Sequence, residues 1–311
     1  MKEAIANSLP RPLARWIHDR RLESRIRREF RADSSRYSNS AAPVDRVLTP
    51  MAPAALETQA TKDYHRVEKG LTLRAPKRPF GADVGRRLDE MLPLLEPETE
   101  LERSARSARE ALRQWNENGT ISDEVSPVAH PTREMSRDQL SELFTGRHSV
   151  RNFDTTRIVS RQDLLTAARL AGRSPSVCNR QAWKVRFAVT DSAKLILRSH
   201  QNGNAGFGEI PVVALITTDA RLFAGSGERN QPWIDGGIFA MSLALALHGL
   251  SLSSCMLNMS LDNDRADSLR RALGLEDHEL IVMEMAIGYA ADNHRFARSP
   301  RRADGEITSF I

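Results

Sequence analysis

The sequence predicts an α+β protein, in which a mixed sheet is flanked by helices and preceded by a helical N-terminal extension. Three observations lead to this fold class. Apolar residues in the first 130 positions recur at helical spacing. Strand patterns occur after residue 137, and helices separate those strands along the chain, as in layered mixed folds. We therefore expect a helical and partly flexible extension, residues 1–130, and a second domain, residues 137–311.

The first helix of the extension is predicted by apolar residues three to five positions apart among arginines and acids, namely Leu13, Trp16, Ile17, Leu22 and Ile26. Such a helix can lie on a membrane surface or on a partner. Packing against its own protein or a second copy is the simpler interpretation. Serines and three prolines within residues 38–55 then break the helix.

The rest of the extension combines a charged segment with two further helices. Residues 63–81 are polar, but they contain side chains of the kind that are usually buried, including Tyr64, Leu71, Leu73 and Phe80. We expect this segment to dock onto another part of the protein. Helical patterns follow over Val84–Leu95 and Glu98–Trp115, and an Asn-Gly turn signal ends the second of them. Residues 120–136 form the expected linker.

The second domain alternates helices and strands. Ser160 at an N-cap, Asp163 three residues later and Gly172 as a stop delimit its first helix. WKVRFAVT alternates as a strand, and IPVVALITTD is a continuously apolar strand of the buried kind. A helix is expected from Asn230 to Gly249, and between Ile238 and Leu247 it is apolar nearly all round, so both of its sides must be covered. LIVMEMAIGYA forms the last strand.

Length and composition describe an ordinary folded protein of 311 residues, 40% of them apolar. No run approaches the roughly 18 apolar residues of a membrane-spanning helix, and the N-terminus lacks a secretory signal. We therefore expect a cytoplasmic protein without integral membrane association. The net charge of +5 lies mainly in the two ends, so we expect no nucleic-acid partner. Two cysteines and eight scattered histidines lack the spacing of a zinc site, and no metal is expected.

The motif GRHSVRNF places Arg147, Ser149 and Arg151 at alternating positions. In an extended segment, residues two apart face the same side, so two guanidinium groups and a hydroxyl can converge on one ligand. A phosphate monoester suits that set of donors. The alternative is a solvated basic edge.

The loop SPSVCNRQAW, residues 174–183, is a second candidate site. Its serines, asparagine and glutamine offer backbone donors and side-chain amides in an irregular segment. A heteroaromatic ring with alternating donors and acceptors would suit it. An ordinary connection between a helix and a strand is the alternative.

Two adjacent glycines, Gly236 and Gly237, lie within the predicted long helix. Each costs about 0.5–1 kcal/mol relative to alanine. Either close helix packing or a flat ligand next to the backbone would explain them.

These blocks together resemble the FMN-dependent nitroreductase family. GRHSVRNFDTTRIV is similar to that family's opening Arg-x-Ser-x-Arg/Lys motif, and SPSVCNRQAWKV to its Pro-Ser-x-x-Asn-x-Gln-Pro-Trp loop. WIDGGIFAMSLALALHGLS resembles its long dimer-core helix, and IGYA and RSPRR resemble its closing strand and basic tail. The likeness spans Arg137–Ile311, with the blocks in the family's order. It departs at Ala182, where the family usually has proline, and no glycine loop for flavin N5 is evident.

The resemblance implies FMN as cofactor and assigns its contacts. Arg147 and Ser149 would hold the phosphate, helped by Arg298 and by Arg301 or Arg302. Arg151 would lie at the pyrimidine edge of the flavin, and His148 would touch the cofactor through its backbone. Four loop residues would line the ring and the ribityl chain: Pro175, Ser176, Asn179 and Gln181. No protein side chain is expected to be catalytic, because the flavin carries the hydride.

The family likeness further implies a homodimer with flavin at its interface and a nitroreductase-like fold. It implies an oxidoreductase in which NAD(P)H and a small nitroaromatic, quinone-like or enone-like acceptor alternate on the flavin. A specialised flavin dehydrogenase or dehalogenase is an alternative, and so is a non-catalytic flavin-fold partner protein. The segment DYHRVEKGLTLRAPKRPFG is similar to one found ahead of this domain in bacterial proteins associated with polysaccharide biosynthesis. There, His65, Glu68 and Lys69 are best interpreted as a structural ion-pair cluster.

Overall fold

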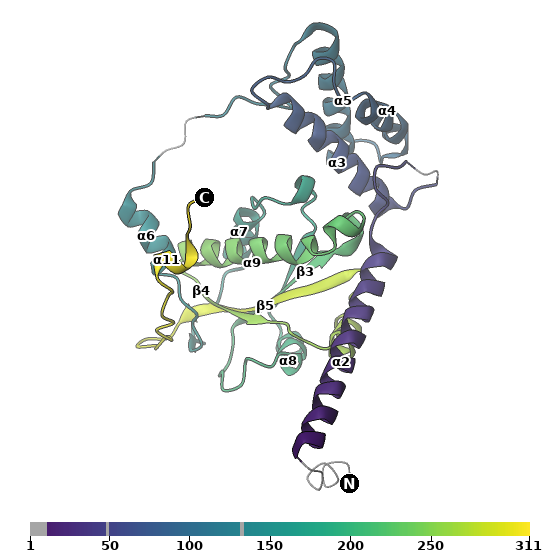
Figure 1. Ribbon diagram of the computed structural model, residues 1–311. Coiled ribbons are helices and arrows are strands. Elements are labelled where there is room, and N and C mark those ends of the chain that lie inside the picture. Colours follow the sequence, from purple (N-terminus) through teal and green to yellow (C-terminus); the bar gives the residue numbers. More distant parts are fainter. Residues whose placement is uncertain (1–10, 48–49, 131–133) are drawn as a thin grey trace.

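The computed structural model describes residues 11–47, 50–130 and 134–311 (Figure 1). In the extension it contains α2 (Arg11–Ser40), α3 (Pro53–Leu71), α4 (Ala82–Met91) and α5 (Glu100–Asn118). In the second domain the helices are α6 (Arg137–Thr145), α7 (Arg161–Ala171), α8 (Asp191–His200), α9 (Gln231–Gly249), α10 (Asn263–Leu273) and α11 (Asp304–Ile307). The strands are β1 (Phe153–Asp154), β2 (Trp183–Ala188), β3 (Val212–Asp219), β4 (Ser253–Asn258) and β5 (Glu279–Ala290).

The sheet is built around the long strand β5. One edge of β5 pairs with β3, which pairs in turn with β2, and the other edge pairs with β4 and, at its end, with β1. All of these pairings are antiparallel. The α+β class with a helical extension is confirmed. Strands β1 and β4 were not expected from the sequence.

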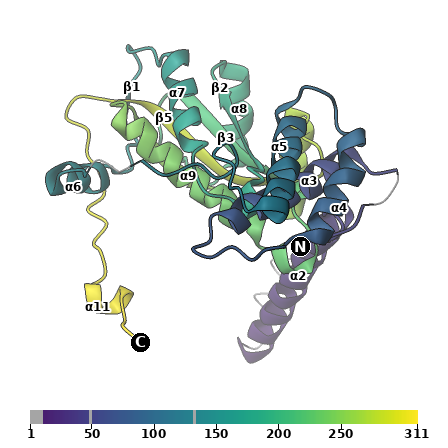
Figure 2. The ribbon, with the colours of Figure 1, turned by 90° about the horizontal axis from the view of Figure 1, so that it is seen from above.

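Helices cover both faces of the sheet, as Figure 1 and Figure 2 show. The core on one face joins α7 and α9 to the sheet through residues such as Leu164, Leu243 and Met285, and the core on the other joins α8 and α10 through Leu197 and Leu269. Because α9 packs on the sheet while its other side is partly exposed, its nearly uniform apolar character is only partly explained within one chain.

The two glycines of α9 have different surroundings. A Cβ atom on Gly236 would lie 2.8 Å from Val282 Cγ2 and 3.1 Å from Thr218 Cγ2, so this glycine allows the helix to pack closely on the sheet. A Cβ atom on Gly237 would meet nothing within 4 Å in the part of the chain that the structure describes. Close packing therefore explains Gly236 alone.

Glu284 is a carboxyl group buried in the middle of β5, between Leu215 and Leu257 of the adjacent strands. Neither carboxyl oxygen has a hydrogen-bond partner among the described residues. Burial raises the pKa of Glu284 from 4.5 to about 7, and Arg198 opposes this shift only in part. The folded state therefore holds this proton more tightly than the unfolded state does.

We expect the free energy of unfolding of the wild type to fall as the pH rises from about 4.5 through 7, since the unfolded carboxyl ionises first. The variant Glu284→Gln should gain about 3 kcal/mol relative to the wild type between pH 4 and pH 8. Urea unfolding at the two pH values measures this. The exposed Glu276→Gln is the matched control, and equal pH dependence of the two variants would contradict the expectation.

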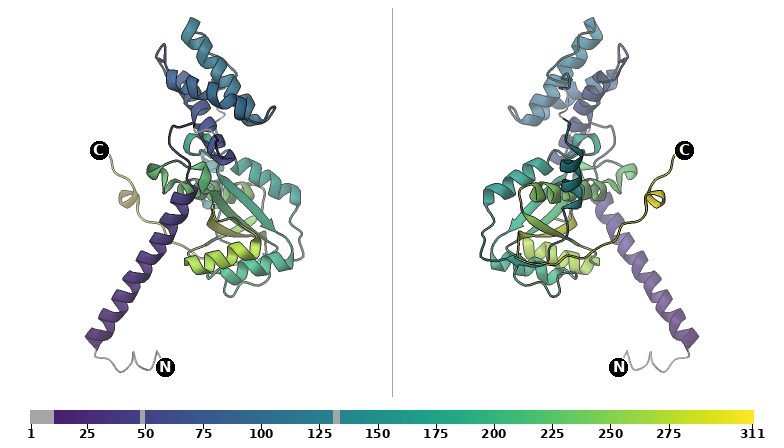
Figure 3. Two further views of the ribbon diagram at one scale, coloured as in Figure 1. Left: turned by 90° about the vertical axis from the view of Figure 1, so that its right-hand side faces the viewer. Right: turned by 90° about the vertical axis from the view of Figure 1, so that its left-hand side faces the viewer.

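The extension has a hydrophobic core of its own, in which α3, α4 and α5 pack through side chains such as Val67, Leu88 and Leu112. The segment 63–81 begins inside α3, so its first nine residues are helical. Tyr64 and Leu71 are buried there. Figure 3 shows these helices at one end of the domain and α2 running down its side.

Helix α2 lies against α10 through polar contacts. Arg25 pairs with Asp262 at 2.8 Å, Arg36 pairs with Asp267 at 2.7 Å, and the Glu29 carboxylate accepts from the Asn263 amide nitrogen at 2.8 Å. The predicted first helix thus packs partly against its own protein. None of the helices described for the chain has the length and apolar character needed to cross a membrane.

Candidate functional site

The segment from Arg147 to Arg151 is held at the edge of the sheet, between α6 and β1. Val150 is buried, and its amide donates to the carbonyl oxygen of Ser254 at 3.1 Å. Burial raises the pKa of the Cys255 thiol in β4, and three neighbours oppose that shift: the charge of Arg151, the Ser149 hydroxyl and the charge of Arg147. Both guanidinium groups and the hydroxyl therefore lie near the start of β4.

The two arginines of this segment have no acidic partner. Among the described residues, no carboxylate forms an ion pair with Arg147 or Arg151, and a weak contact of 3.4 Å joins Arg151 Nη1 to the Ser149 carbonyl. Arg180 and Arg186, in contrast, pair with glutamates at 2.6 and 2.7 Å. Two uncompensated cations beside a hydroxyl are a donor set that fits a phosphate group.

The loop of residues 174–183 has an uncommon backbone. Cys178, Asn179 and Gln181 have φ angles of 47°, 55° and 48°, in the left-handed region that residues with a side chain rarely adopt. Such conformations persist only where surrounding contacts fix them, and they cluster at functional sites.

Polar contacts fix the loop of residues 174–183 in this conformation. The Val177 amide donates to Asp235 Oδ2 at 3.1 Å, and the Gln181 amide donates to the Ser176 hydroxyl at 3.0 Å. Asp235 lies in α9 and is 1% exposed, and burial raises the pKa of its carboxyl. The loop is therefore tied to the long helix.

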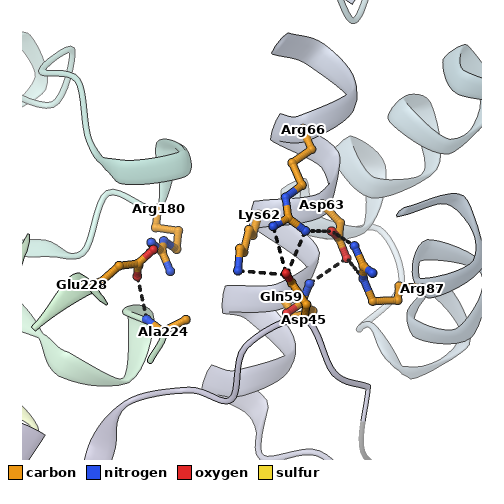
Figure 4. A network of polar contacts seen from close by, with 9 residues as sticks. All are labelled: Asp45, Gln59, Lys62, Asp63, Arg66, Arg87, Arg180, Ala224 and Glu228. Carbon is orange, nitrogen blue, oxygen red and sulfur yellow. Dashed lines mark hydrogen bonds and ion pairs between the residues drawn. The ribbon is translucent and has the colours of Figure 1, made fainter. Parts of the chain in front are cut away.

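A buried ion pair between Arg180 and Glu228 stabilises the loop of residues 174–183. The Arg180 side chain is 1% exposed, and its Nη2 donates to Glu228 Oε2 at 2.6 Å. The same carboxylate oxygen accepts from the Ala224 amide at 2.7 Å. Arg180 Nε also donates to the Val177 carbonyl, at 3.2 Å. Figure 4 shows this pair beside the charged side chains of α3.

The extension docks directly on these loops. The Ala42 amide donates to the Phe223 carbonyl at 2.8 Å, and the Tyr37 hydroxyl donates to the Gly225 carbonyl at 2.8 Å. From α3, Tyr64 reaches the side chain of Asn179. Burial is the main reason that the pKa of Tyr64 is raised. The segment expected to dock does so, and its contact is with the second candidate site.

The two candidate regions lie at opposite ends of β5. The loop leads into Trp183, which is level with Thr218 and Leu280, whereas Ser149 bridges Ser254, which is level with Ile287. Leu280 and Ile287 are separated by roughly 23 Å along the strand. Within one chain, the structure therefore does not bring the loop side chains Pro175, Ser176, Asn179 and Gln181 to Arg147, Ser149 and Arg151.

The basic tail leaves the domain beside α6, as Figure 2 shows. Arg298, Arg301 and Arg302 are exposed. Arg301 Nη1 donates to the Ser299 carbonyl at 2.6 Å, within the tail itself. His148, in turn, directs its ring toward His294 at the start of the tail, with 3.0 Å between the two Nε2 atoms.

Four residues of this region were not expected from the sequence: Arg180, Glu228, Asp235 and Tyr64. An arginine within a loop of amides carries no periodic signal. Its acidic partner is 48 residues away, so only the folded chain shows the pair.

The family model described as "Nitroreductase family" matches residues 144–200 and 187–289. No curated protein matches the chain.

Two solved structures are similar in fold. One is a candidate nitroreductase from Exiguobacterium sibiricum in complex with FMN, with 19% identity, coverage of 58% of this chain and 100% of that chain, and a TM-score of 0.50. Another is the candidate nitroreductase YdfN from Bacillus subtilis, with 18% identity, coverage of 57% and 100%, and a TM-score of 0.50. The part of the chain that this family model matches, residues 144–289, carries Arg147, Ser149 and the loop of residues 174–183, and it belongs to the nitroreductase family.

Proposed function

We propose that this oxidoreductase of the nitroreductase family binds FMN and uses NAD(P)H to reduce a small nitroaromatic, quinone-like or enone-like acceptor. The observation that carries the proposal is the pair of uncompensated guanidinium groups at Arg147 and Arg151, beside the Ser149 hydroxyl. A similar structure from Exiguobacterium sibiricum is described as a complex with FMN.

Each residue has a defined role in this proposal. Arg147 and Ser149 hold the phosphate together with Arg298 and Arg301, and Arg151 presents a fixed positive charge to the pyrimidine edge of the ring. When bound, FMN supplies the hydride chemistry. Four loop residues line the ring and the ribityl chain: Pro175, Ser176, Asn179 and Gln181.

A second copy of the chain completes the site in this proposal. Because the loop and the arginine segment lie at opposite ends of β5, one flavin can contact both only if the loop belongs to a partner. The outer side of α9 suits such an interface, since Trp233, Ile234 and Met241 are 46%, 50% and 37% exposed. Gly237 opens toward the same space, where a partner backbone could approach closely.

The purified protein is expected to be yellow and to lose its absorbance on addition of NADH or NADPH under anaerobic conditions. Arg147→Ala should weaken FMN binding by roughly 10- to 100-fold, because it removes a charge-assisted hydrogen bond of about 1.5–3 kcal/mol. Flavin fluorescence during titration of the apoprotein gives the dissociation constant.

Arg86→Ala is the matched control, because Arg86 is an exposed arginine of α4, far from the segment in sequence. Its FMN affinity should equal that of the wild type. A colourless protein that FMN cannot reconstitute would refute the proposed function.

A further inference from the structure

Two histidines join the arginine segment to the C-terminal tail. Nε2 of His148 and Nε2 of His294 are 3.0 Å apart. The ring centroids are 5.3 Å apart and the ring planes differ by only 14°, so the rings meet end to end and nearly in one plane. This is the geometry of a direct hydrogen bond between the two nitrogens.

The other nitrogen of each ring determines how many protons the pair carries. His148 Nδ1 lies 3.0 Å from the Gly146 carbonyl oxygen, and His294 Nδ1 lies 3.0 Å from the Ala291 carbonyl oxygen. A carbonyl oxygen only accepts, so both Nδ1 atoms must carry hydrogen. Rotating either ring by 180° would place carbon atoms at both of its contacts, so the ring orientations are fixed together.

The contact between the Nε2 atoms then requires one more proton. With both Nδ1 atoms protonated, two neutral rings would present lone pairs to each other, and two imidazolium rings would present N–H groups to each other. Only a pair with a single proton between its Nε2 atoms forms a hydrogen bond. The pair therefore carries one positive charge.

One neighbour of the pair favours that charge, and another opposes it. The ring of Phe296 stacks on His148 with centroids 4.1 Å apart, and an aromatic face attracts a cation. Beside the pair lies a small cavity of about 100 Å³, lined in part by Arg147, His248, Ser253 and Ser254. Among the described residues that line it, the other titratable or charged groups are Arg147 and His248, and none is a carboxylate, so the charge of Arg147 opposes that of the pair.

We propose that His148 and His294 share one proton and act as positioning residues, which fasten the start of the tail to the Arg147–Ser149 segment and add fixed positive charge there. The effect on the phosphate rests on the proposed function, whereas the shared proton does not. His148 then acts through its side chain, in addition to the backbone contact with FMN implied by the family resemblance.

Nuclear magnetic resonance of protein labelled with 15N-histidine tests the shared proton directly. Near neutral pH, we expect one strongly deshielded proton coupled to an Nε2 atom of the pair, and protonated Nδ1 atoms in both rings. Spectra with two neutral rings or two imidazolium rings near neutral pH would overturn the proposal.

Limited trypsin digestion tests the fastening. Cleavage of the Arg295–Phe296 bond, next to His294, should become roughly tenfold faster in His294→Ala, because the contact with His148 that protects this segment is lost. In His148→Gln the amide can still donate to His294, so cleavage should stay within about twofold of the wild type. His278→Ala, at the other end of β5, is the control and should cleave like the wild type.

Titration with FMN distinguishes the effect of the positive charge on the histidine pair from the effect of attaching the tail. His148→Gln keeps a hydrogen bond but removes the charge, so it should weaken FMN binding several-fold while the tail stays protected. Unchanged FMN affinity in both His148→Gln and His294→Ala would refute the positioning role. If the wild type binds no FMN, the proposed function fails, and the spectra and the digestion still decide the shared proton.

Discussion

Replacing Glu228 with alanine should destabilise the protein by about 3–5 kcal/mol, the usual cost of removing one partner of a buried ion pair. The guanidinium of Arg180 would stay buried without its carboxylate, and the Ala224 amide would lose its acceptor as well. Arg180 Nη1 already lacks a partner among the described residues. The loop of residues 174–183 should therefore lose its fixed conformation first.

Urea unfolding measures the loss, and hydrogen exchange of the peptide that contains residues 176–181 localises it. Arg229→Ala changes the next residue, whose exposed guanidinium contacts the Ser226 carbonyl at 3.2 Å, and should cost less than about 0.5 kcal/mol. The double variant Arg180→Leu/Glu228→Leu should recover part of the loss, since no charge is left buried. Equal stability of Glu228→Ala and Arg229→Ala would contradict this reading of the pair.

The variant Asp63→Ala should destabilise the extension by a similar amount, about 3–5 kcal/mol. Asp63 is fully buried in α3 and binds the Arg87 guanidinium through two bonds of 2.7 Å. It also accepts from Gln59 at 2.8 Å and from Arg66 at 3.1 Å, as Figure 4 shows. Removal of this carboxylate would leave Arg87 buried and unpaired.

Asp83→Ala is a suitable control for this second prediction. Asp83 lies in α4, its side chain is 84% exposed, and it pairs with Arg86 at 3.6 Å, so the expected loss is below about 0.5 kcal/mol. Thermal unfolding monitored through the fluorescence of Trp115, in α5, reports on the extension. The prediction fails if Asp63→Ala and Asp83→Ala have the same melting temperature.

The elements predicted well from the sequence are those with a strong local pattern. Ser160 accepts from the amides of Gln162 and Asp163, so the predicted N-cap of α7 is correct. The continuously apolar β3 and the long α9 were expected within two residues of their observed bounds. Burial on both faces of the sheet requires such runs, and a run of that kind is visible in the sequence alone.

The elements that were missed lack such a pattern. Strand β4 begins with small polar residues, Ser253 and Ser254, and owes its conformation to pairing with β5. Strand β1 has two residues and depends on the end of the same strand. The start of segment 63–81 is helical because it continues α3, although its charged composition suggested only a docked segment.

In the candidate site, too, features with a local sequence pattern were predicted, and contacts between distant residues were not. Alternation in the motif GRHSVRNF indicated the unpaired cations, because that pattern is local. The buried pair of Arg180 and Glu228 and the contact between His148 and His294 join residues 48 and 146 positions apart. No spacing rule relates such residues, so these contacts required the folded chain.

The attachment of α2 to α10 has a consequence for synthesis. Arg25 and its partner Asp262 are 237 positions apart, so the ribosome makes the amino-terminal helix long before the surface that receives it. Trp16, Ile26 and Phe30 stay exposed even in the folded chain, at 57%, 46% and 71%, so association of this helix with other chains during translation competes with its docking on α10. The contacts of α2 with α10 can therefore form only after Asp262 and the residues that follow it have been synthesised.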